Sequence, residues 1–430
     1  MPKVSIVIPV YNVEAYLREC LDSVVNQTLR DIEIVCIDDG SNDNSGAILD
    51  EYAIGDPRIK VVHKENGGYG RAMNIGIDMA IGEYIGIVEP DDYIERNAVE
   101  ILYNNAKANE LDIVSADYKK FYGDNGKRIF KVLQIISDPL LYNVVINPSH
   151  CKKIFKGIFI NPAGLFRRSF LVQNDIKHNE SPGASYQDAG FCFLTLAYAK
   201  RLMLIHEQLY CYRQDNPNSS IASKEKVNCI FHEYNHIWSV ITKNSEQLEA
   251  FIPEYLRRRF ISCSFAYSRI AHQYKLDFLM QFSADFNTYK EKGILSLESF
   301  NEKEKEKLLA IMENPIIFNE KVNFLSTELY EALRNYRMAV IYGAGVIGKR
   351  ILDTLYEDDR KKILGFAVTD INKNISHYKG CPVRCIDEYI PYKDHVAVIV
   401  GVTEIYKQEI IYISTKKGFK NIITLSSILE

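Results

Sequence analysis

Short apolar runs alternate with segments of helical periodicity over residues 4–94, and no other feature constrains the fold as strongly. The runs are rich in β-branched residues, as buried strands are. They span residues 4–10, 32–37, 61–63 and 84–88. Because strands that alternate with helices form a largely parallel sheet covered on both faces, this part of the chain predicts an α/β fold.

Polar or glycine-rich residues follow every one of these runs. They are Tyr11-Asn12, Asp38-Asp39, residues 66–70 and residues 89–92. In such sheets, ligands bind outside the carboxyl ends of the strands. One acidic strand end is often a helix cap, whereas four specialised ends in one sheet favour a ligand site.

The fourth strand ends in three carboxylates around Pro90. Glu89, Asp91 and Asp92 can hold a hard divalent cation, and that cation can hold a diphosphate. The alternative is a simple turn, because Pro and Asp favour turns.

The other strand ends also have a chemical use and a plainer alternative. Asp39 can accept hydrogen bonds from a base or a ribose, or it can cap the helix that follows. Gly67 and Gly68 let a ligand approach the backbone, or they form an ordinary turn. Arg71 lies in a first helical turn, where a cation opposes the helix dipole, and this favours a phosphate partner.

The composition points to a soluble protein of two or three domains, since the chain has 430 residues. A net charge of -4 gives no electrostatic case for a nucleic-acid partner. The nine cysteines lack the spacing of metal or disulfide sites, which favours reduced thiols and a cytosolic protein. The sequence shows no signal-peptide pattern and no apolar run of transmembrane length.

Together, these motifs resemble those of family 2 glycosyltransferases with the GT-A fold. The resemblance covers about the first half of the chain and is carried by Pro9 to Asn12, Ile37 to Ser41, Asn66 to Asn74, Gly82 to Tyr84 and Glu89 to Asp92. It implies inverting transfer of a sugar from a nucleotide diphosphate, usually UDP, with Mn²⁺ or Mg²⁺ as cofactor.

The resemblance also implies a set of contacts for the nucleotide-sugar donor. These would come from Pro9, Tyr11, Glu14, Asp39, Asn66, Gly67, Gly68, Arg71, Asp92 and Arg213. Asp91 would bind the metal, helped by Glu89 or Asp92. The chain departs from the family pattern at Glu89, where Asp is usual, and at Met73, where Arg is usual.

Tyr186-Gln187-Asp188 precedes a helical pattern and resembles the family's second acidic motif, in which Gln187 replaces the usual Glu. Asp188 would then be the catalytic base, because inverting transfer needs one base near the attacking hydroxyl. The alternative is an acidic residue that stabilises a helix N-terminus. Tyr212 to Gln214, followed by Ser219-Ser220, resembles the family's loop that closes over the donor, with Arg213 at a phosphate or in a surface salt bridge.

Three domains are expected: a GT-A domain at 1–222, a helical segment at 223–336 and a small Rossmann-like domain at 337–430. The helical segment contains Arg257-Arg258-Arg259. We interpret this run as a solvated face, with contact to an anionic lipid or polymer as the alternative.

In the last domain, a strand at 339–342 precedes Gly343, Gly345 and Gly348, and Asp370 follows the next strand. This order fits a dinucleotide fingerprint. Three interpretations remain open: a working nucleotide or dinucleotide site, a regulatory nucleotide-sugar site, or glycines used only for helix–strand packing. The third is favoured, because no recognisable catalytic group accompanies the fingerprint.

The sequence therefore predicts a cytoplasmic inverting glycosyltransferase that extends a glycan or lipid-linked acceptor in surface polysaccharide synthesis. Loose association with the inner face of the plasma membrane and a homo-oligomer formed through the helical or C-terminal region remain open. The alternatives are a non-catalytic scaffold that binds nucleotide-sugars and a bifunctional enzyme whose C-terminal domain binds NAD(P).

Overall fold

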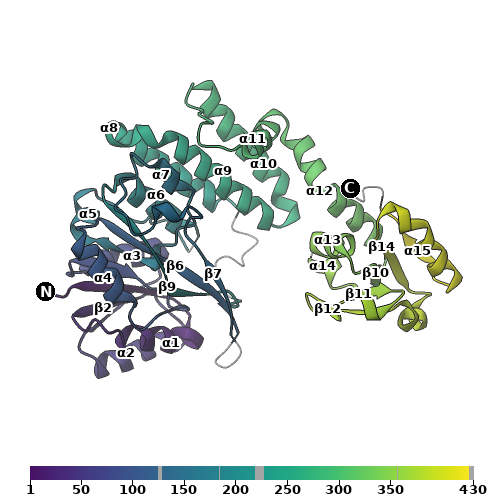
Figure 1. The fold of residues 1–430 in the computed structure, drawn as a ribbon, viewed down its shortest axis with the longest axis horizontal. Coiled ribbons are helices and arrows are strands. Elements are labelled where there is room, and N and C mark those ends of the chain that lie inside the picture. Colours follow the sequence, from purple (N-terminus) through teal and green to yellow (C-terminus); the bar gives the residue numbers. More distant parts are fainter. Residues whose placement is uncertain (124–127, 184, 218–226, 356, 426–430) are drawn as a thin grey trace. The chain divides into compact units, whose positions relative to one another are not determined.

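The computed structural model describes residues 1–123, 128–183, 185–217, 227–355 and 357–425. The chain forms two compact units (Figure 1). The first comprises Met1–Tyr274 and Ala284–Leu309, and the second comprises Lys275–Ser283 and Ala310–Glu430. The three-part division at residues 222 and 336 stays a prediction. Residue 222 and the predicted closing loop at Ser219-Ser220 lie outside the described residues.

The first unit begins with the strand–helix alternation that the sequence predicts. The elements are β1 (Val4–Val10), α1 (Glu14–Val25), β2 (Ile32–Asp38), α2 (Ser45–Gly55), β3 (Ile59–His63), α3 (Tyr69–Met79) and β4 (Tyr84–Ile87). Strand β1 pairs in parallel with both β2 and β4, and β2 pairs in parallel with β3. The predicted parallel α/β arrangement is confirmed.

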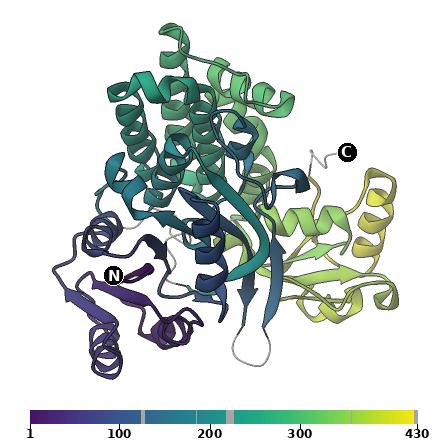
Figure 2. The same ribbon diagram turned by 60° about the vertical axis from the view of Figure 1, so that its left-hand side comes forward.

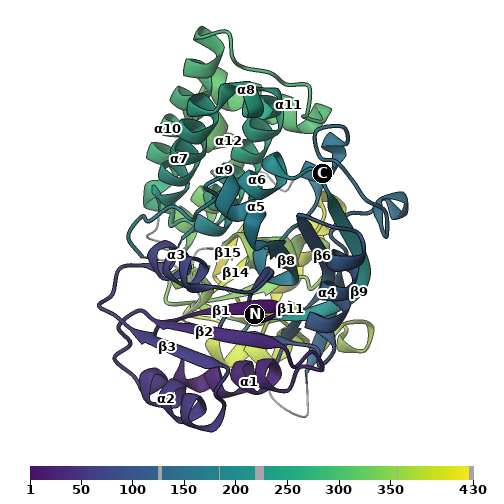
Figure 3. The same cartoon turned by 90° about the vertical axis from the view of Figure 1, so that its left-hand side faces the viewer.

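Both faces of these strands are covered by helices. Ile6 and Ile8 of β1 point into a core shared with Leu17 of α1, while Val7 faces the other way. A side chain at Gly76 of α3 would come within 2.3 Å of Val7, so α3 packs directly on that second face. Figure 3 shows α1 and α2 on one side of β1–β3 and α3 on the other. The near-continuous apolar strands follow from this double burial.

The sheet continues with strands of both directions. The further elements are β5 (Tyr93–Ile94), α4 (Ala98–Ala108), β6 (Ile113–Tyr122), β7 (Ile129–Leu133), β8 (Gly164–Arg167), α5 (Arg168–Gln173), α6 (Gln187–Tyr198) and β9 (Leu202–Arg213), with short 3₁₀ turns at Pro139–Leu141, Lys152–Lys156 and Asn161–Ala163. The strand order is β3-β2-β1-β4-β8-β6-β9-β5. Strand β8 runs antiparallel to its neighbours β4 and β6. Strand β7 pairs antiparallel with β6, and the two strands lie side by side (Figure 2).

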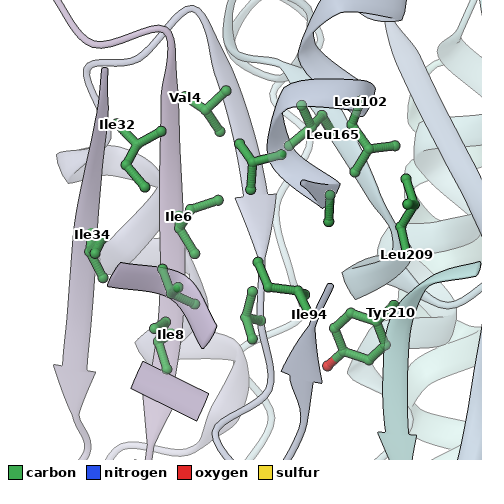
Figure 4. Close-up of a cluster of buried hydrophobic side chains, with 14 of the residues drawn as sticks. Val4, Ile6, Ile8, Ile32, Ile34, Ile94, Leu102, Leu165, Leu209 and Tyr210 are labelled. Atoms are coloured by element: carbon green, nitrogen blue, oxygen red, sulfur yellow. The ribbon is translucent and has the colours of Figure 1, made fainter. Parts of the chain in front are cut away.

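The core of this unit joins the two halves of the sheet. Figure 4 shows Ile6 and Ile34 of the parallel strands in one cluster with Leu102 of α4, Leu165 of β8 and Tyr210 of β9. Burial of these side chains fixes β9 beside the end of β4, where polar residues gather.

Helices follow β9, as the sequence predicts. They are α7 (Cys229–Lys243), α8 (Ser245–Leu248), a 3₁₀ turn (Glu249–Phe251), α9 (Ile252–Arg269), α10 (His272–Glu291), α11 (Glu302–Glu313) and α12 (Pro315–Leu333). In the first unit, α7 packs against α6 and α9. Among the described residues, no helix has both the length and the apolar character needed to cross a membrane.

The second unit contains a small, mostly parallel sheet. Its elements are β10 (Met338–Tyr342), α13 (Val346–Thr354), α14 (Glu357–Arg360), β11 (Ile363–Val368), a 3₁₀ turn (Ile371–Lys373), β12 (His377–Tyr378), β13 (Cys381–Cys385), a 3₁₀ segment (Ile386–Tyr392), β14 (Val396–Val400), α15 (Glu404–Lys416) and β15 (Asn421–Ile423). The strand order is β12-β13-β11-β10-β14-β15, and among the described strands of this second sheet β12 alone is antiparallel. Its designation as Rossmann-like stays a prediction.

The glycines after β10 serve close packing. Gly343 has φ +115°, and a side chain at Gly348 would come within 1.8 Å of the Gly343 carbonyl oxygen. By contrast, Gly345 borders open space, and Asp370 is exposed and accepts a 3.0 Å hydrogen bond from the backbone of Asn372. This geometry favours the packing interpretation, and a nucleotide or dinucleotide site here stays a prediction.

Candidate active site

The carboxylate of Asp39 holds the glycine-rich loop after β3. Its two oxygens accept hydrogen bonds from the backbone N–H groups of Gly67 and Gly68, at 2.8 and 2.9 Å. Lys64 pairs with the same carboxylate, and Asp39 is only 4% exposed. The N-cap of α2 is Asn44, so Asp39 is not the helix cap. These bonds favour a role in positioning the loop over the direct base or ribose contact that the sequence predicts.

Arg71 is an exposed cation beside this loop. It lies in the first turn of α3, and no carboxylate in the described part of the chain pairs with it. A side chain at Gly67 would come within 2.8 Å of the Arg71 side chain and 3.0 Å of Nζ of Lys64, so both cations flank the loop. A guanidinium without a carboxylate partner suits a phosphate.

The other residues predicted to contact the nucleotide take different positions. Pro9 is buried within β1, and Asn66 donates a 3.0 Å hydrogen bond from its side chain to the backbone carbonyl of Asp39. Glu14 accepts a 2.8 Å hydrogen bond from the backbone at the start of α2. Tyr11, at the carboxyl end of β1, is 48% exposed. The geometry thus indicates structural roles for Pro9, Asn66 and Glu14. The Tyr11 ring remains available to stack on a base.

The end of β4 contributes two carboxylates that are only partly bonded. Oε1 of Glu89 accepts a 2.7 Å hydrogen bond from the hydroxyl of Tyr69, and Oδ2 of Asp91 accepts one of 2.8 Å from Asn216. The second oxygen of each carboxylate receives no hydrogen bond from the described residues. Burial, together with the nearby charges of Asp91 and Asp188, raises the pKa of Glu89 to about 8. The carboxylates of Glu89, Asp91 and Asp188 therefore influence one another electrostatically.

Asp92 and Arg213 lie inside the protein, which favours structural roles, and the donor contacts predicted for both stay predictions. Asp92 is 2% exposed, and its oxygens accept hydrogen bonds from the Tyr210 hydroxyl at 2.6 Å and the Arg213 backbone at 2.7 Å. The Arg213 guanidinium donates to the backbone carbonyl of Asp91 at 2.9 Å and to Glu19 at 2.7 Å. Since Arg213 is 5% exposed, its ion pairs are not surface salt bridges, and its contact with a phosphate stays a prediction. Both residues tie β9 to the acidic strand end.

Asp188 occupies the first turn of α6. The helix begins after Tyr186, which has a left-handed backbone with φ 66°. One oxygen of Asp188 accepts a 2.9 Å hydrogen bond from the Ala189 backbone. The side chain keeps access to solvent, yet desolvation by the surrounding protein raises the pKa of its carboxyl. A strained non-glycine backbone beside such a group is typical of functional sites.

Gln187 holds the loop that leads into α6. Its Oε1 accepts a 2.6 Å hydrogen bond from the backbone of Ser185, and its Nε2 donates to the Ser181 hydroxyl at 2.9 Å and the Gly183 carbonyl at 3.2 Å. A carboxylate cannot donate to a carbonyl. The departure from the usual glutamate at this position therefore has a structural reason.

Helix α3 packs tightly on the same loop region. A side chain at Gly70 would come within 2.0 Å of the carbonyl oxygen of Asn179. One turn later, the Asn74 side chain exchanges two 2.9 Å hydrogen bonds with the backbone of His178. These contacts bring the segment before Asp188 to the glycine-rich loop, more than a hundred residues away in sequence.

Comparison with known proteins decides the family. Residues 5–171 match the model of Glycosyl transferase family 2. Over 215 residues the chain is 33% identical to glycosyltransferase GlyG of Streptococcus pneumoniae, and the match covers 49% of this chain and 70% of GlyG. The chain belongs to glycosyl transferase family 2. The predicted enzyme class, a glycosyltransferase, is confirmed.

Two further proteins extend the comparison. The uncharacterized glycosyltransferase EpsJ of Bacillus subtilis is 36% identical over 224 residues, which cover 51% of this chain and 63% of EpsJ. The chain thus spans less than two thirds of EpsJ. The crystal structure of S. aureus TarS 1-349 in complex with UDP matches with a TM-score of 0.55 at 19% identity, covering 75% of this chain and 91% of TarS 1-349. At this identity the likeness concerns the fold, and it confirms the predicted GT-A fold.

Two residues of this family 2 glycosyltransferase fit a divalent cation. Glu89 and Asp91 each offer an uncommitted carboxylate oxygen at the same strand end. Mg²⁺ is usually bound through one or two carboxylates plus substrate phosphates and water. The described residues contain no group of three or more His, Cys, Asp or Glu side chains placed to hold a metal ion. The protein would therefore supply two ligands and the diphosphate would supply others.

Three residues of the glycosyltransferase site escaped the sequence interpretation. Tyr69 and Lys64 adjoin the predicted loop, and their positions beside its glycines were the available signal. Glu233 of α7 is 1% exposed and accepts a 3.0 Å hydrogen bond from Asn179. Burial raises the pKa of Glu233 to about 7. A lone carboxylate within the apolar pattern of residues 230–237 was its only sequence signal.

Proposed function

We propose that this glycosyltransferase moves a sugar from a UDP-sugar donor to an acceptor hydroxyl, with inversion at the anomeric carbon. The observation that carries the proposal is the position of Tyr69, which joins the two acidic motifs. Its hydroxyl donates a 2.7 Å hydrogen bond to Glu89, and its backbone N–H donates a 3.0 Å hydrogen bond to the carbonyl of Gly183, in the loop that leads to Asp188. A base and a pair of candidate metal ligands are the two acidic components that inverting transfer needs.

Asp188 acts as the base in this proposal. Its carboxylate takes the proton of the acceptor hydroxyl while the hydroxyl oxygen attacks the anomeric carbon, and the nucleoside diphosphate departs from the opposite face. The raised pKa of Asp188 makes the carboxylate a better proton acceptor near neutral pH. Glu89 and Asp91 would hold Mn²⁺ or Mg²⁺, which offsets the negative charge on the leaving diphosphate.

The donor lies along the loop after β3 in this proposal. Arg71 pairs with the diphosphate, the backbone of Gly67 and Gly68 approaches it, and Tyr11 stacks on the base. Asp39 and Lys64 keep the loop in place. UDP is favoured as the nucleotide because TarS, which shares the fold, has been solved with UDP and with UDP-GlcNAc. The acceptor is a glycan or lipid-linked glycan of surface polysaccharide synthesis, extended on the cytoplasmic side of the membrane.

A panel of UDP-sugars, assayed for UDP release with Mn²⁺ and with Mg²⁺, tests this function. We expect metal-dependent release with one donor or a few related donors. The anomeric configuration of the product, read by NMR coupling constants, is expected to be opposite to that of the donor. UDP binding without turnover for any donor would favour the non-catalytic scaffold, and retention of configuration would contradict the single-base mechanism.

A further inference from the structure

The three consecutive arginines of α9 have three different environments. Arg257 forms two hydrogen bonds with Glu304, at 2.7 and 2.8 Å. Arg259 is 1% exposed and pairs with Asp285. This burial and pairing correct the interpretation of the run as a solvated face.

Arg258 differs from both neighbours. One of its nitrogens donates a 2.9 Å hydrogen bond to the backbone carbonyl of Gly157. It forms no ion pair with any carboxylate among the described residues. Because Arg258 is partly buried, its charge is only partly compensated by water. The guanidinium therefore has donors that a bound anion can use.

A cavity of about 110 Å³ lies beside this guanidinium in the first unit. Its lining comes from the 3₁₀ turn before β8 and from α6, α7 and α9. The polar members of the lining are Asn161, Asp188, Cys192, Tyr234, Arg258 and Ser262. At roughly 30 Å³ for each water molecule in the liquid, the cavity has room for a few waters or for one tetrahedral anion.

The cavity presents opposite charges that do not neutralise each other by contact. Asp188 and Arg258 both line it, and they form no ion pair. The hydroxyls of Tyr234 and Ser262 are 2.8 Å apart in the same wall, and one of them can donate to a ligand. A ligand that places a hydroxyl at Asp188 and an anion at Arg258 would satisfy both charges. The planar guanidinium matches a phosphate with two parallel hydrogen bonds.

We propose that this cavity is an acceptor subsite that binds a phosphate ester carried by the acceptor. Arg258 pairs with the phosphate and thereby places a neighbouring hydroxyl at Asp188. The inference rests on the proposed function, since it assigns the substrate class of the same site. Arg258 is then a specificity-determining residue, and an acceptor without a phosphate near the reacting hydroxyl is bound weakly.

Calorimetry with the full chain tests the subsite without requiring turnover. The probes are glycerol 3-phosphate, glucuronate and glycerol, each added in the presence of UDP and Mn²⁺. We expect glycerol 3-phosphate to bind at least about tenfold more tightly than the other two, as a charge-assisted pair predicts. Stronger binding of glucuronate would assign the site to carboxylates and overturn the phosphate assignment.

Variants of the arginine run provide the matched comparison. R258Q is expected to weaken glycerol 3-phosphate binding by about tenfold or more, R258K by less because the charge remains, and R257Q not at all. The unfolding temperature of each variant is measured in parallel. If R258Q does not fold, the comparison of the wild type with a folded R258K variant still tests the subsite. Equal affinity in the wild type and R258K and R258Q variants, or no binding by the wild type, would overturn the subsite.

Farnesyl phosphate serves as a further probe, because the phosphate ester could belong to a lipid-linked acceptor or to a polyol or sugar phosphate. A lipid-linked acceptor predicts that farnesyl phosphate binds more tightly than glycerol 3-phosphate, and a polyol or sugar phosphate predicts the reverse. The calorimetric result is independent of the test of the proposed function. Phosphate affinity that depends on Arg258 can be measured even if the chain releases UDP from no donor.

Discussion

The hydroxyl of Tyr69 donates a 2.7 Å hydrogen bond to Oε1 of Glu89, and so joins the first turn of α3 to the acidic end of β4. The bond stabilises the ionised form of a carboxylate whose pKa burial raises to about 8. It links the predicted nucleotide loop to the predicted metal ligands within one hydrogen bond.

Tyr69→Phe removes this donor, so Glu89 is expected to hold its proton more strongly and to bind a cation less well. The metal concentration for half-maximal UDP release should rise by about 10- to 100-fold, since one hydrogen bond to a charged group contributes about 1.5–3 kcal/mol. Tyr103→Phe is the control, because its 3.2 Å hydrogen bond goes to Glu83, outside the site. An unchanged metal requirement in Tyr69→Phe would separate Glu89 from metal binding.

Gly70→Ala tests the contact between α3 and the loop before Asp188. The new methyl group would lie 2.0 Å from the backbone of Asn179, and such overpacking costs about 1–3 kcal/mol. The variant should unfold at a lower urea concentration than the wild type, and its rate of UDP release should be lower. In the control Gly55→Ala, the methyl group meets nothing within 4 Å, and the helix should gain up to about 1 kcal/mol. If Gly70→Ala is as stable as the wild type, the packing described here is wrong.

Arg213→Gln distinguishes a structural from a phosphate-binding arginine. Loss of the bonds to Glu19 and to the Asp91 carbonyl should lower the free energy of unfolding by about 2 kcal/mol or more, because the charge partners are partly buried. The exposed pair Arg18–Glu51 gives the control Arg18→Gln, which is expected to leave the unfolding curve close to that of the wild type. A normal unfolding curve with a raised KM for the donor would instead restore the phosphate contact that the sequence predicts.

Glu233→Gln should change how stability depends on pH. The pKa of Glu233 is about 7 in the folded chain against 4.5 ordinarily, so the folded state keeps a proton that the unfolded state loses between these values. The wild type therefore loses stability on the order of 3 kcal/mol as pH rises from 4.5 to 7. The glutamine variant lacks this loss. Urea unfolding at several pH values compares the two proteins, with the exposed Glu207→Gln as control. Parallel curves for the wild type and Glu233→Gln would contradict the buried carboxyl.

The sequence was sufficient for the parallel strands, because their β-branched runs and polar ends are local patterns. It also placed Glu89, Asp91 and Asp188 by their motifs, and in the structure Tyr69 bonds both to Glu89 and to the loop before Asp188. The sequence did not predict which side chains pair when they lie far apart along the chain. Arg213 meets Glu19, which lies 194 residues away, and no local pattern could distinguish that partner from a phosphate.

Asp39 shows the same limit at a shorter range. Its place after β2 was evident from the sequence, but the hydrogen bonds that commit both of its oxygens to Gly67 and Gly68 depend on how the next strand returns. The three arginines of α9 differ only in their direction around the helix, so their separate partners depend on how α10, α11 and the segment at Gly157 pack against α9.

UDP release by Asp188→Asn, measured with the best donor and metal, tests the central claim most directly. Asparagine keeps the size of the side chain, but its amide cannot take the proton of the acceptor hydroxyl near neutral pH. Turnover should fall by about 10²- to 10⁴-fold, the range for general base catalysis, while calorimetric affinity for UDP stays within about threefold. Asp78→Asn, which changes an exposed ion pair with Lys177, should retain full activity. Turnover by Asp188→Asn within a fewfold of the wild type would contradict the assignment of Asp188 as the base.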